Sequence, residues 1–404
     1  MSAGAGVAGL AQGLRARTVA LDNPGADLLA FAGDEGVLVE REGCGLAGRG
    51  VALRLPAAEA EAALAAIATE DEVGLPGCGP VVIGALPFDR AATGEVIVPR
   101  TVLGRHPGGT VWMTTIGGAA PAQPGPAARQ PPDAFELRAS RPHAEWCDIA
   151  RRAVDEVVEG RLHKVVLARE VVVEANRPIL PLDVVARLRA LYPSCLLFSV
   201  EGFVGASPEL LVGRRGREVQ SHPLAGTIPR SGDPVVDARA AEGLLASAKD
   251  REEHRLVVDA VAAVLAPACG ELHVPATPSI VPLRNVSHLG TLVTGRLSEP
   301  APSALALARR LHPTPAVAGT PTGPALAWLA ANEGLDRGRY AGPVGWMDSR
   351  GDGDWAVGIR SAEVDGCRAR LLAGVGVVAD STPEAELAET QLKLQALLAA
   401  VVRP

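Results

Sequence analysis

The sequence predicts an α+β protein with antiparallel strands, and three observations support this fold class. The first part of the chain contains short strand-like runs separated by glycine and proline, at 51–55, 80–88 and 110–116. In the later part, helix-like and strand-like segments alternate along the chain. Residues 342–381 have the pattern of antiparallel strands joined by Gly/Asp turns.

The elements of the later part follow from periodicity. Trp146, Ile149, Ala153 and Val157 fall on one helical face, which predicts a helix over 142–158. Further patterns predict strands at 164–173 and near 196–204, a long helix or a helix pair at 236–266, and a C-terminal helix at 384–402. A Pro-, Ala- and Gly-rich stretch without periodicity, at 117–136, predicts a surface linker.

Composition narrows the class of protein. The chain has 404 residues, 48% of them hydrophobic, so it can bury a large core, and its length allows one large domain or two or three smaller ones. A net charge of -7 argues against a nucleic-acid or anionic-membrane binder, yet allows a small anionic ligand at a local basic cluster. We see no secretory signal and no run of ~18 apolar residues. The six scattered cysteines suit free thiols. We therefore expect a cytoplasmic protein without nucleic-acid or membrane partners.

Lys164 does not fit a purely structural strand. It stands at the start of the predicted strand 164–173 and is followed by Val165, Val166 and Leu167. An ammonium group is strongly hydrated and is costly to bury without a partner. A lysine at this place therefore needs a functional or an ion-pairing explanation.

Two glutamates lie on apolar helix faces. Glu253 precedes the apolar stripe over 256–264 by one turn, so its carboxylate should point toward the core. Glu389 and Lys393 form an i, i+4 pair, which by itself is most simply an exposed ion pair. An ordinary paired glutamate at the fringe of the stripe is likewise the simplest reading of Glu253. Two inward carboxylates could instead coordinate one Mg²⁺, which takes oxygen ligands from one or two carboxylates and from water or an anionic substrate.

Other local motifs are weak. The segment AGVGVVAD at 373–380 lacks the third glycine of a dinucleotide fingerprint, and no P-loop pattern occurs. It is either a turn that lets the backbone approach a ligand or a tight hairpin. His288 and His312, taken alone, are most simply core or turn histidines. No GxSxG or HExxH pattern is present.

Several segments taken in order resemble one family, the chorismate-utilising enzymes. This group includes isochorismate synthases, salicylate synthases, the large subunit of anthranilate synthase and aminodeoxychorismate synthase. The similarity spans residues 142–400, whereas residues 1–141 match only loosely. The segments that are similar are HKVVLAR (163–169), VGASPELLV (204–212), HPLAGTIPR (222–230), KDREEHRLVVDAV (249–261), LHPTPAVAGTP (311–321), YAGPVGWMD (340–348), WAVGIRSAEV (355–364) and AGVGVVADSTPEAELAETQLK (373–393).

Single residues within these segments distinguish the different enzymes of the family. Aminodeoxychorismate synthases have a lysine nucleophile where this chain has Ala225, and anthranilate synthases tend to have glutamine where it has Lys164. Both amine-inserting reactions are therefore disfavoured. Salicylate synthases share the lysine, but LHPTPAV resembles the isochorismate synthases more closely. The resemblance thus implies the reversible conversion of chorismate to isochorismate, by attack of water at C2 and loss of the C4 hydroxyl.

The resemblance also implies residue roles. Lys164 is similar to the general base, with a pKa lowered by its apolar neighbours, and Glu209 to the general acid. Glu253 and Glu389 are similar to the family's Mg²⁺ ligands, and Arg360 to the arginine that clamps a substrate carboxylate. The remaining residues expected to bind substrate are Ala225, Gly226, Thr227, His288, His312, Thr314, Gly374, Gly376 and Lys393.

By resemblance, the fold is one large domain in which two antiparallel β-sheets pack as a sandwich with helices outside. Residues 1–20 are then a disordered N-terminus, residues 21–404 one chorismate-binding domain, and 117–136 an internal loop. We expect a monomer that binds chorismate and works without a glutaminase subunit.

Two alternatives stay open. A salicylate synthase would form isochorismate and then eliminate pyruvate at the same site. The second alternative is a relative that binds chorismate but has no catalytic activity. The presence of Lys164, Glu209, Glu253 and Glu389 argues against it, because such charged residues are costly to bury and tend to be lost from inactive sites. The sequence also leaves open whether the isochorismate serves siderophore or menaquinone biosynthesis.

Overall fold

In the computed structural model, residues 7–118 and 130–402 are described, and they confirm the α+β class with large antiparallel sheets. In the first part, the strands are β1 (Arg15–Leu21), β2 (Val37–Arg41), β3 (Cys44–Pro56), β4 (Ala68–Asp71), β5 (Val81–Ala85), β6 (Glu95–Arg105) and β7 (Val111–Ile116). The helical segments there are α1 (Val7–Ala11), α2 (Leu28–Ala32), η1 (Ala57–Glu59) and α3 (Ala60–Ala66).

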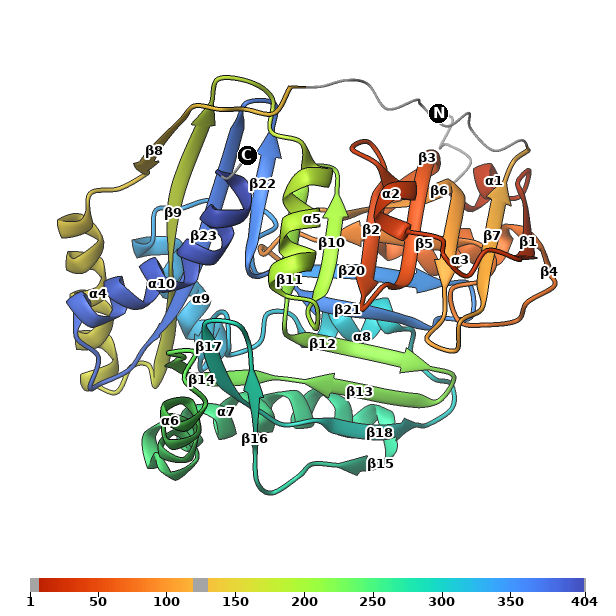
Figure 1. Cartoon of the computed structure of the whole chain (residues 1–404). Helices are drawn as coiled ribbons and strands as arrows, with labels where there is room; N and C mark the ends of the chain where they lie inside the picture. Colours follow the sequence, from red (N-terminus) through yellow and green to blue (C-terminus); the bar gives the residue numbers. More distant parts are fainter. Residues whose placement is uncertain (1–6, 119–129, 403–404) are drawn as a thin grey trace, which may run out of the picture.

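The later part supplies the longer elements (Figure 1). Its strands are β8 (Phe135–Ala139), β9 (Lys164–Ala175), β10 (Leu196–Val200), β11 (Phe203–Ser207), β12 (Leu210–Arg215), β13 (Glu218–His222), β14 (Leu224–Pro229), β15 (Cys269–His273), β16 (Ser279–Pro282), β17 (Val286–Gly290), β18 (Val293–Leu297), β19 (Gly319–Thr320), β20 (Pro343–Asp348), β21 (Gly353–Val357), β22 (Ser361–Asp365) and β23 (Arg368–Val377). Its helices are α4 (His143–Val158), α5 (Pro181–Leu191), α6 (Pro234–Ala246), α7 (Ala248–Leu265), η2 (Ala266–Ala268), α8 (Ala304–Leu311), α9 (Thr322–Asn332) and α10 (Pro383–Val401).

The predicted elements are confirmed with two refinements. The helices expected at 142–158 and 384–402 are α4 and α10. Residues 236–266, expected to form one long helix or two, form the two helices α6 and α7, which meet at Ser247. Ser247 caps α7 by accepting a hydrogen bond from the Asp250 N–H. The single strand expected near 196–204 is instead the hairpin of β10 and β11, because Glu201 and Gly202 both take positive φ and turn the chain.

The large antiparallel sheets that we expected are present, and their strands are hydrogen-bonded to one another. Hydrogen bonds connect 20 strands of the described residues into one sheet, and β14, β17 and β16 form a second, small one. The connection runs through β6, whose start pairs with β5 and whose end pairs with β7, while β3 pairs with it along most of its length. A bulge in β3 between Val51 and Leu53 bends this long pair, so the sheet folds over instead of ending.

The predicted disorder of residues 1–20 is wrong for the part that the structure describes. Within it lie α1 and most of β1, which pairs with β7 and β4. Ala16 and Thr18 point inward, and the Thr18 and Thr114 hydroxyls are 2.8 Å apart. This period of two buries one face of the strand and so orders it. Residues 1–6 lie outside the described residues, as do 119–129 of the predicted linker, whose last residues enter β8.

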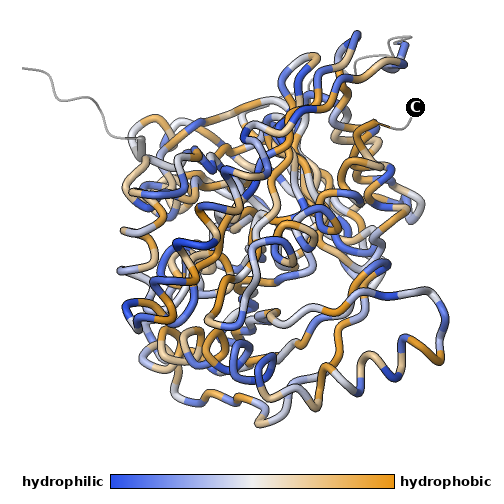
Figure 2. Tube along the Cα trace, turned by 90° about the vertical axis from the view of Figure 1, so that its left-hand side faces the viewer, coloured by the Kyte–Doolittle hydropathy of each residue, from blue (hydrophilic) through white to orange (hydrophobic). Residues whose placement is uncertain are grey.

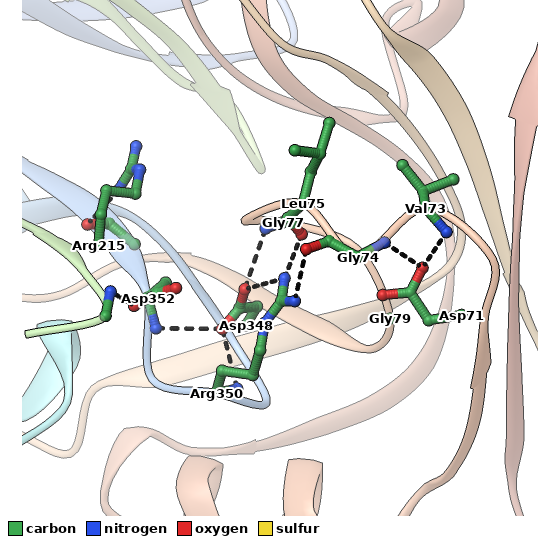
Figure 3. Close-up of polar contacts among 12 residues, drawn as sticks. Asp71, Val73, Gly74, Leu75, Gly77, Gly79, Arg215, Asp348, Arg350 and Asp352 are labelled. Carbon is green, nitrogen blue, oxygen red and sulfur yellow. Dashed lines mark hydrogen bonds and ion pairs between the residues drawn. The ribbon is translucent and has the colours of Figure 1, made fainter.

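Figure 3 shows how the N-terminal strands are fixed to the β20–β21 hairpin. The buried Asp348 carboxylate accepts hydrogen bonds from the Gly77 N–H at 3.0 Å and from the Asp352 N–H at 3.0 Å. Arg350 donates to the Gly74 carbonyl from the same hairpin. Burial raises the pKa of Asp348, the Gly77 N–H and Arg350 oppose that rise, and the negative charge of Asp352 adds to it. The loop between β4 and β5 is therefore held by side chains of a hairpin far away in sequence.

The helices cover the sheet faces. Helices α4 and α10 pack together and against β9 and β23, and α8 packs on β12, β20 and β21. Figure 2 shows hydrophobic segments running through the middle of the trace. In the described part of the chain, no helix is both long enough and apolar enough to span a membrane.

Candidate active site

A cavity of about 290 Å³ brings together most of the residues predicted from the sequence. Its walls come from β9, β14, β23 and the start of α7, with α10 contributing from the C-terminal end of the chain. The predicted residues that line it are Lys164, Glu209, Ala225, Gly226, Thr227, Glu253, His288, Arg360, Gly374, Gly376, Glu389 and Lys393. A mostly enclosed site with several convergent charges is the usual setting for binding a small polar ligand.

Lys164 begins β9 and is only 2% exposed. Its Nζ lies 2.6 Å from Glu253 Oε1, so the ammonium that the sequence placed in an apolar strand has a partner. Burial opposes ionisation of Glu253, but the charges of Lys164, Lys393 and Lys249 outweigh it and lower the pKa of that carboxyl. The inward direction predicted for Glu253 is therefore confirmed.

Glu209 lies between β11 and β12 and is 4% exposed. Burial raises its pKa to about 8, although a hydrogen bond from the Leu224 backbone and the charge of Lys164 act in the opposite direction. The carboxyl is therefore protonated at neutral pH. A buried carboxylic acid facing the same cavity as a lysine is a suitable proton donor.

Arg360 faces the cavity with unused hydrogen-bonding capacity. Its Nη1 is buried and has no hydrogen-bond partner among the described residues. The residue has φ of +53°, which is unusual for a side chain other than glycine and is typically kept where function requires it. A buried guanidinium with a free donor is well suited to bind a carboxylate.

Lys393 and His288 complete this side of the cavity. Lys393 Nζ donates to the Gly374 carbonyl at 2.9 Å and lies 2.8 Å from Glu389 Oε1. His288 Nδ1 is 3.2 Å from the Gly226 carbonyl and 3.0 Å from the Thr227 hydroxyl. Burial lowers the pKa of His288 to about 3, with the charges of Arg360 and Lys393 adding to the effect. The imidazole is therefore neutral and contributes hydrogen bonds, not charge.

The cavity also contains the two carboxylates that were predicted to bind a divalent cation. Glu253 and Glu389 line the cavity, and Glu386, one turn before Glu389 on α10, lies beside them. Burial raises the pKa of Glu386, and the negative charge of Glu389 adds to that rise. No group of three acidic, histidine or cysteine side chains within the described ranges is close enough to hold a metal ion by itself. Two carboxylates together with water and an anionic substrate are nevertheless a sufficient ligand set for Mg²⁺.

The structure corrects two of the predicted contacts, because His312 and Thr314 do not line this cavity. His312 Nε2 donates to the Phe88 carbonyl at 2.9 Å, and its ring packs edge-on against Phe88. It faces a second cavity of about 570 Å³ instead. The Thr314 carbonyl accepts from the Val317 and Ala318 N–H groups. Of the segment LHPTPAVAGTP (311–321), Ala316 and Val317 line the first cavity. The segment therefore forms part of the wall of that cavity.

Sequence reasoning missed several charged and polar residues of the cavity, among them Lys249, Asp250, Tyr340 and Glu386. Helical spacing could have found two of them. Asp250 lies three residues before Glu253 and Glu386 three residues before Glu389, so each shares a face with a predicted residue. Burial raises the pKa of Tyr340 to about 12, which keeps its hydroxyl protonated.

We expect Gly376→Ala to lower kcat sharply without unfolding the protein. A Cβ at this position would lie 2.6 Å from Lys164 Cε and 3.2 Å from Lys164 Nζ, so the lysine must move. Misplacing a catalytic group by about 1 Å can cost about 100-fold in rate. Steady-state kinetics and thermal unfolding measure the two effects. Gly243→Ala on α6 is the control, because a Cβ there would touch no other atom. Gly366→Ala would not be suitable, because Gly366 has a positive φ that alanine rarely adopts. A Gly376→Ala enzyme with wild-type kcat would contradict this placement of Lys164.

A buried lysine and a protonated glutamate in one cavity suit acid–base chemistry on a small anionic substrate. Residues 118–402 match the family model described as "Chorismate binding enzyme". Isochorismate synthase DhbC of Bacillus subtilis is 38% identical over 333 residues, which cover 80% of this chain and 81% of that protein. Isochorismate synthase EntC of Escherichia coli is 36% identical over 325 residues, 79% of this chain and 80% of that protein. The crystal structure of DhbC from Bacillus anthracis has a TM-score of 0.79 at 36% identity, covering 92% of this chain and 98% of that one. The chain therefore belongs to the chorismate-binding enzyme family.

Proposed function

We propose that the chain is an isochorismate synthase, which interconverts chorismate and isochorismate. The observation that supports this reaction most directly is that Lys164 and the protonated Glu209 line one cavity. Water addition at one carbon and hydroxide loss at another need a base and an acid, and the cavity holds one of each. The relatives of 36–38% identity named as isochorismate synthases support the same reaction.

The reaction follows from these roles. Lys164 would take a proton from the water that attacks C2 of chorismate. Glu209 gives its proton to the C4 hydroxyl, which leaves as water while the ring double bonds shift. The enolpyruvyl ether stays intact. In the reverse direction the two residues exchange roles, so the enzyme should work from either compound.

The anionic groups of the substrate have matching partners. Arg360 would bind the enolpyruvyl carboxylate with its free donors, and Lys393 with the backbone around Gly226 and Gly374 would complete the cradle. Glu253 and Glu389 would hold Mg²⁺, which neutralises the ring carboxylate when it is bound. Glu386 lies near enough to Glu389 in the same wall to support this acidic side.

Reversibility tests the proposal. Purified protein with Mg²⁺ should convert added isochorismate to chorismate, and both starting compounds should reach the same mixture. Chromatographic separation of the products measures this. Failure to act on either compound would overturn the proposed function, and a salicylate synthase would instead accumulate salicylate and pyruvate.

Glu209 also gives the reaction an expected pH dependence. Its pKa is raised to about 8, so the acid form is present below this pH and is lost as the pH rises through it. We therefore expect kcat/KM in the direction of isochorismate, which reports ionisations of the free enzyme, to fall above about pH 8. Initial rates at low chorismate concentration between about pH 6 and pH 10 measure it. A kcat/KM that keeps rising through this range would show that Glu209 is not the acid.

The assembly and pathway are part of the same proposal. We expect a cytoplasmic monomer. It should need no glutaminase subunit, because the nucleophile is water and not ammonia. Size-exclusion chromatography with light scattering tests the monomer. Siderophore or menaquinone biosynthesis would consume the product, and dependence of growth on the gene under iron limitation would favour the first.

A further inference from the structure

A buried ion pair lies directly behind the wall of the cavity. Glu333 and Arg337 are 4% and 3% exposed and do not line the cavity themselves. Arg337 donates to Glu333 through Nε at 2.8 Å and through Nη2 at 2.6 Å. Burying such a pair costs desolvation free energy that their attraction does not generally recover. Its other contacts therefore have to explain why it is there.

Those contacts join two segments of the cavity wall. Arg337 Nη2 donates to the Val166 carbonyl at 2.6 Å, and Nη1 donates to the Val317 carbonyl at 2.8 Å. Glu333 Oε1 also accepts from the Ala168 N–H at 2.7 Å. Val166 and Val317 both line the cavity, and Val166 is two residues beyond Lys164 on β9. One guanidinium thus ties the strand of the lysine to the neighbouring wall segment, to which the Val166 N–H also donates, at the Ala318 carbonyl.

The pair is itself fixed from the outside. The Arg337 guanidinium carbon lies 4.3 Å from the centre of the Phe88 ring. The Phe88 N–H donates to the Gly338 carbonyl at 2.8 Å, and Arg141 Nη1 donates to the Glu333 carbonyl at 2.7 Å. The side chains of Arg337 and Glu333 therefore have little freedom to move. A contact network of this kind sets distances between the parts it joins.

We propose that Arg337, oriented by Glu333, is a positioning residue that sets the distance between Lys164 and the wall at Ala316–Val317. The inference rests on the proposed function, because it assigns the proton transfer to Lys164. Arg337 touches neither substrate nor reacting atoms. It acts through the carbonyl groups of Val166 and Val317, and loss of either bond lets the segment at Ala316–Val317 move relative to β9, which its pairing with β23 holds in place.

Arg339 offers a matched control. It also pairs with a glutamate, Glu363, at 3.1 Å, and donates to two backbone carbonyls, Val200 at 2.8 Å and Glu201 at 3.1 Å. Its guanidinium carbon lies 5.1 Å from the centre of the Phe203 ring. The set of contacts is nearly the same, but they lie at the β10–β11 hairpin and outside the cavity. Replacing either arginine by lysine therefore removes the same kinds of bond at two different places, although the Arg339–Glu363 side chains are 23% and 25% exposed and those of Arg337 and Glu333 only 2% and 6%.

The experiment compares Arg337→Lys, Arg337→Met and Arg339→Lys by steady-state kinetics per folded protein, with circular dichroism and thermal unfolding measured alongside. Lysine keeps the charge beside Glu333 but cannot reach both carbonyls. We expect kcat to fall about 10- to 100-fold in both Arg337 variants, with KM for chorismate within about twofold of wild type. Arg339→Lys should keep kcat within about twofold.

Three results would overturn the proposal. Wild-type kcat in folded Arg337→Lys would show that only the charge matters. An equal loss in Arg339→Lys would show that the effect is general. Failure of both Arg337 variants to fold would make the pair a structural element. The proposed function is tested separately, because it fails only if the wild-type protein does not interconvert chorismate and isochorismate.

Discussion

Glu209→Gln is expected to lower kcat roughly 100-fold or more, the range for loss of a proton-transfer group. Glutamine has the size of a protonated glutamic acid and can still donate a hydrogen bond, but it cannot release a proton to the departing C4 hydroxyl. KM should therefore change little. Steady-state kinetics of chorismate consumption, with thermal unfolding as a check on folding, measure this effect.

Lys164→Ala should reduce kcat by a similar factor, because the attacking water loses its base. Glu40→Gln is a matched control for the glutamate: Glu40 is 1% exposed and burial also raises its pKa, but it lies on β2 and outside the cavity. Its kcat should stay close to wild type. Turnover at the wild-type rate by a folded Lys164 or Glu209 variant would show that the residue is misassigned.

Removal of the metal is the second large effect that we expect. Excess chelator should abolish activity, and added Mg²⁺ should restore it, because we propose that Glu253 and Glu389, which line the cavity, hold the ion that neutralises the ring carboxylate. Glu253→Ala and Glu389→Ala should each lose most turnover. Initial rates at a series of free Mg²⁺ concentrations measure both effects.

The two glutamates differ in one useful way. Glu253→Ala also removes the partner of Lys164, whereas Glu389→Ala leaves that ion pair in place. A higher Mg²⁺ requirement in Glu389→Ala would therefore report on the metal without disturbing Lys164, although this variant also removes the partner of Lys393. Glu252→Ala is the control, since Glu252 is exposed on α7 and pairs with Arg255. Full activity in excess chelator would contradict the metal assignment.

Local patterns predicted the elements well where periodicity was strong. The helix over 142–158 and the strand from Lys164 were found because apolar spacing records which face is buried. The same reasoning placed Glu253 toward the interior, where it meets Lys164. The spacing of apolar residues could not predict that Lys164 and Glu253 pair with each other, because they are 89 positions apart in the sequence. The resemblance to the family brought them into one site.

The errors have physical causes as well. The connection of the expected sheets through β3 and β6 adds a detail that no local pattern records. The order of β1 comes from its pairing with β7, almost 100 residues away. His312 belongs to a family motif, but its hydrogen bond to the Phe88 carbonyl directs it away from the cavity. A motif identifies the segment at a site, whereas the backbone decides which of its side chains enter.

The source of the new hydroxyl oxygen tests the central claim most directly. Purified protein would be incubated with chorismate and Mg²⁺ in water enriched in ¹⁸O, and the products analysed by mass spectrometry. Attack of water at C2 with loss of the C4 hydroxyl predicts isochorismate that contains one ¹⁸O atom and an intact enolpyruvyl ether. Unlabelled isochorismate would contradict the attack of water, and salicylate formed together with pyruvate at the rate of chorismate loss would contradict the proposed product.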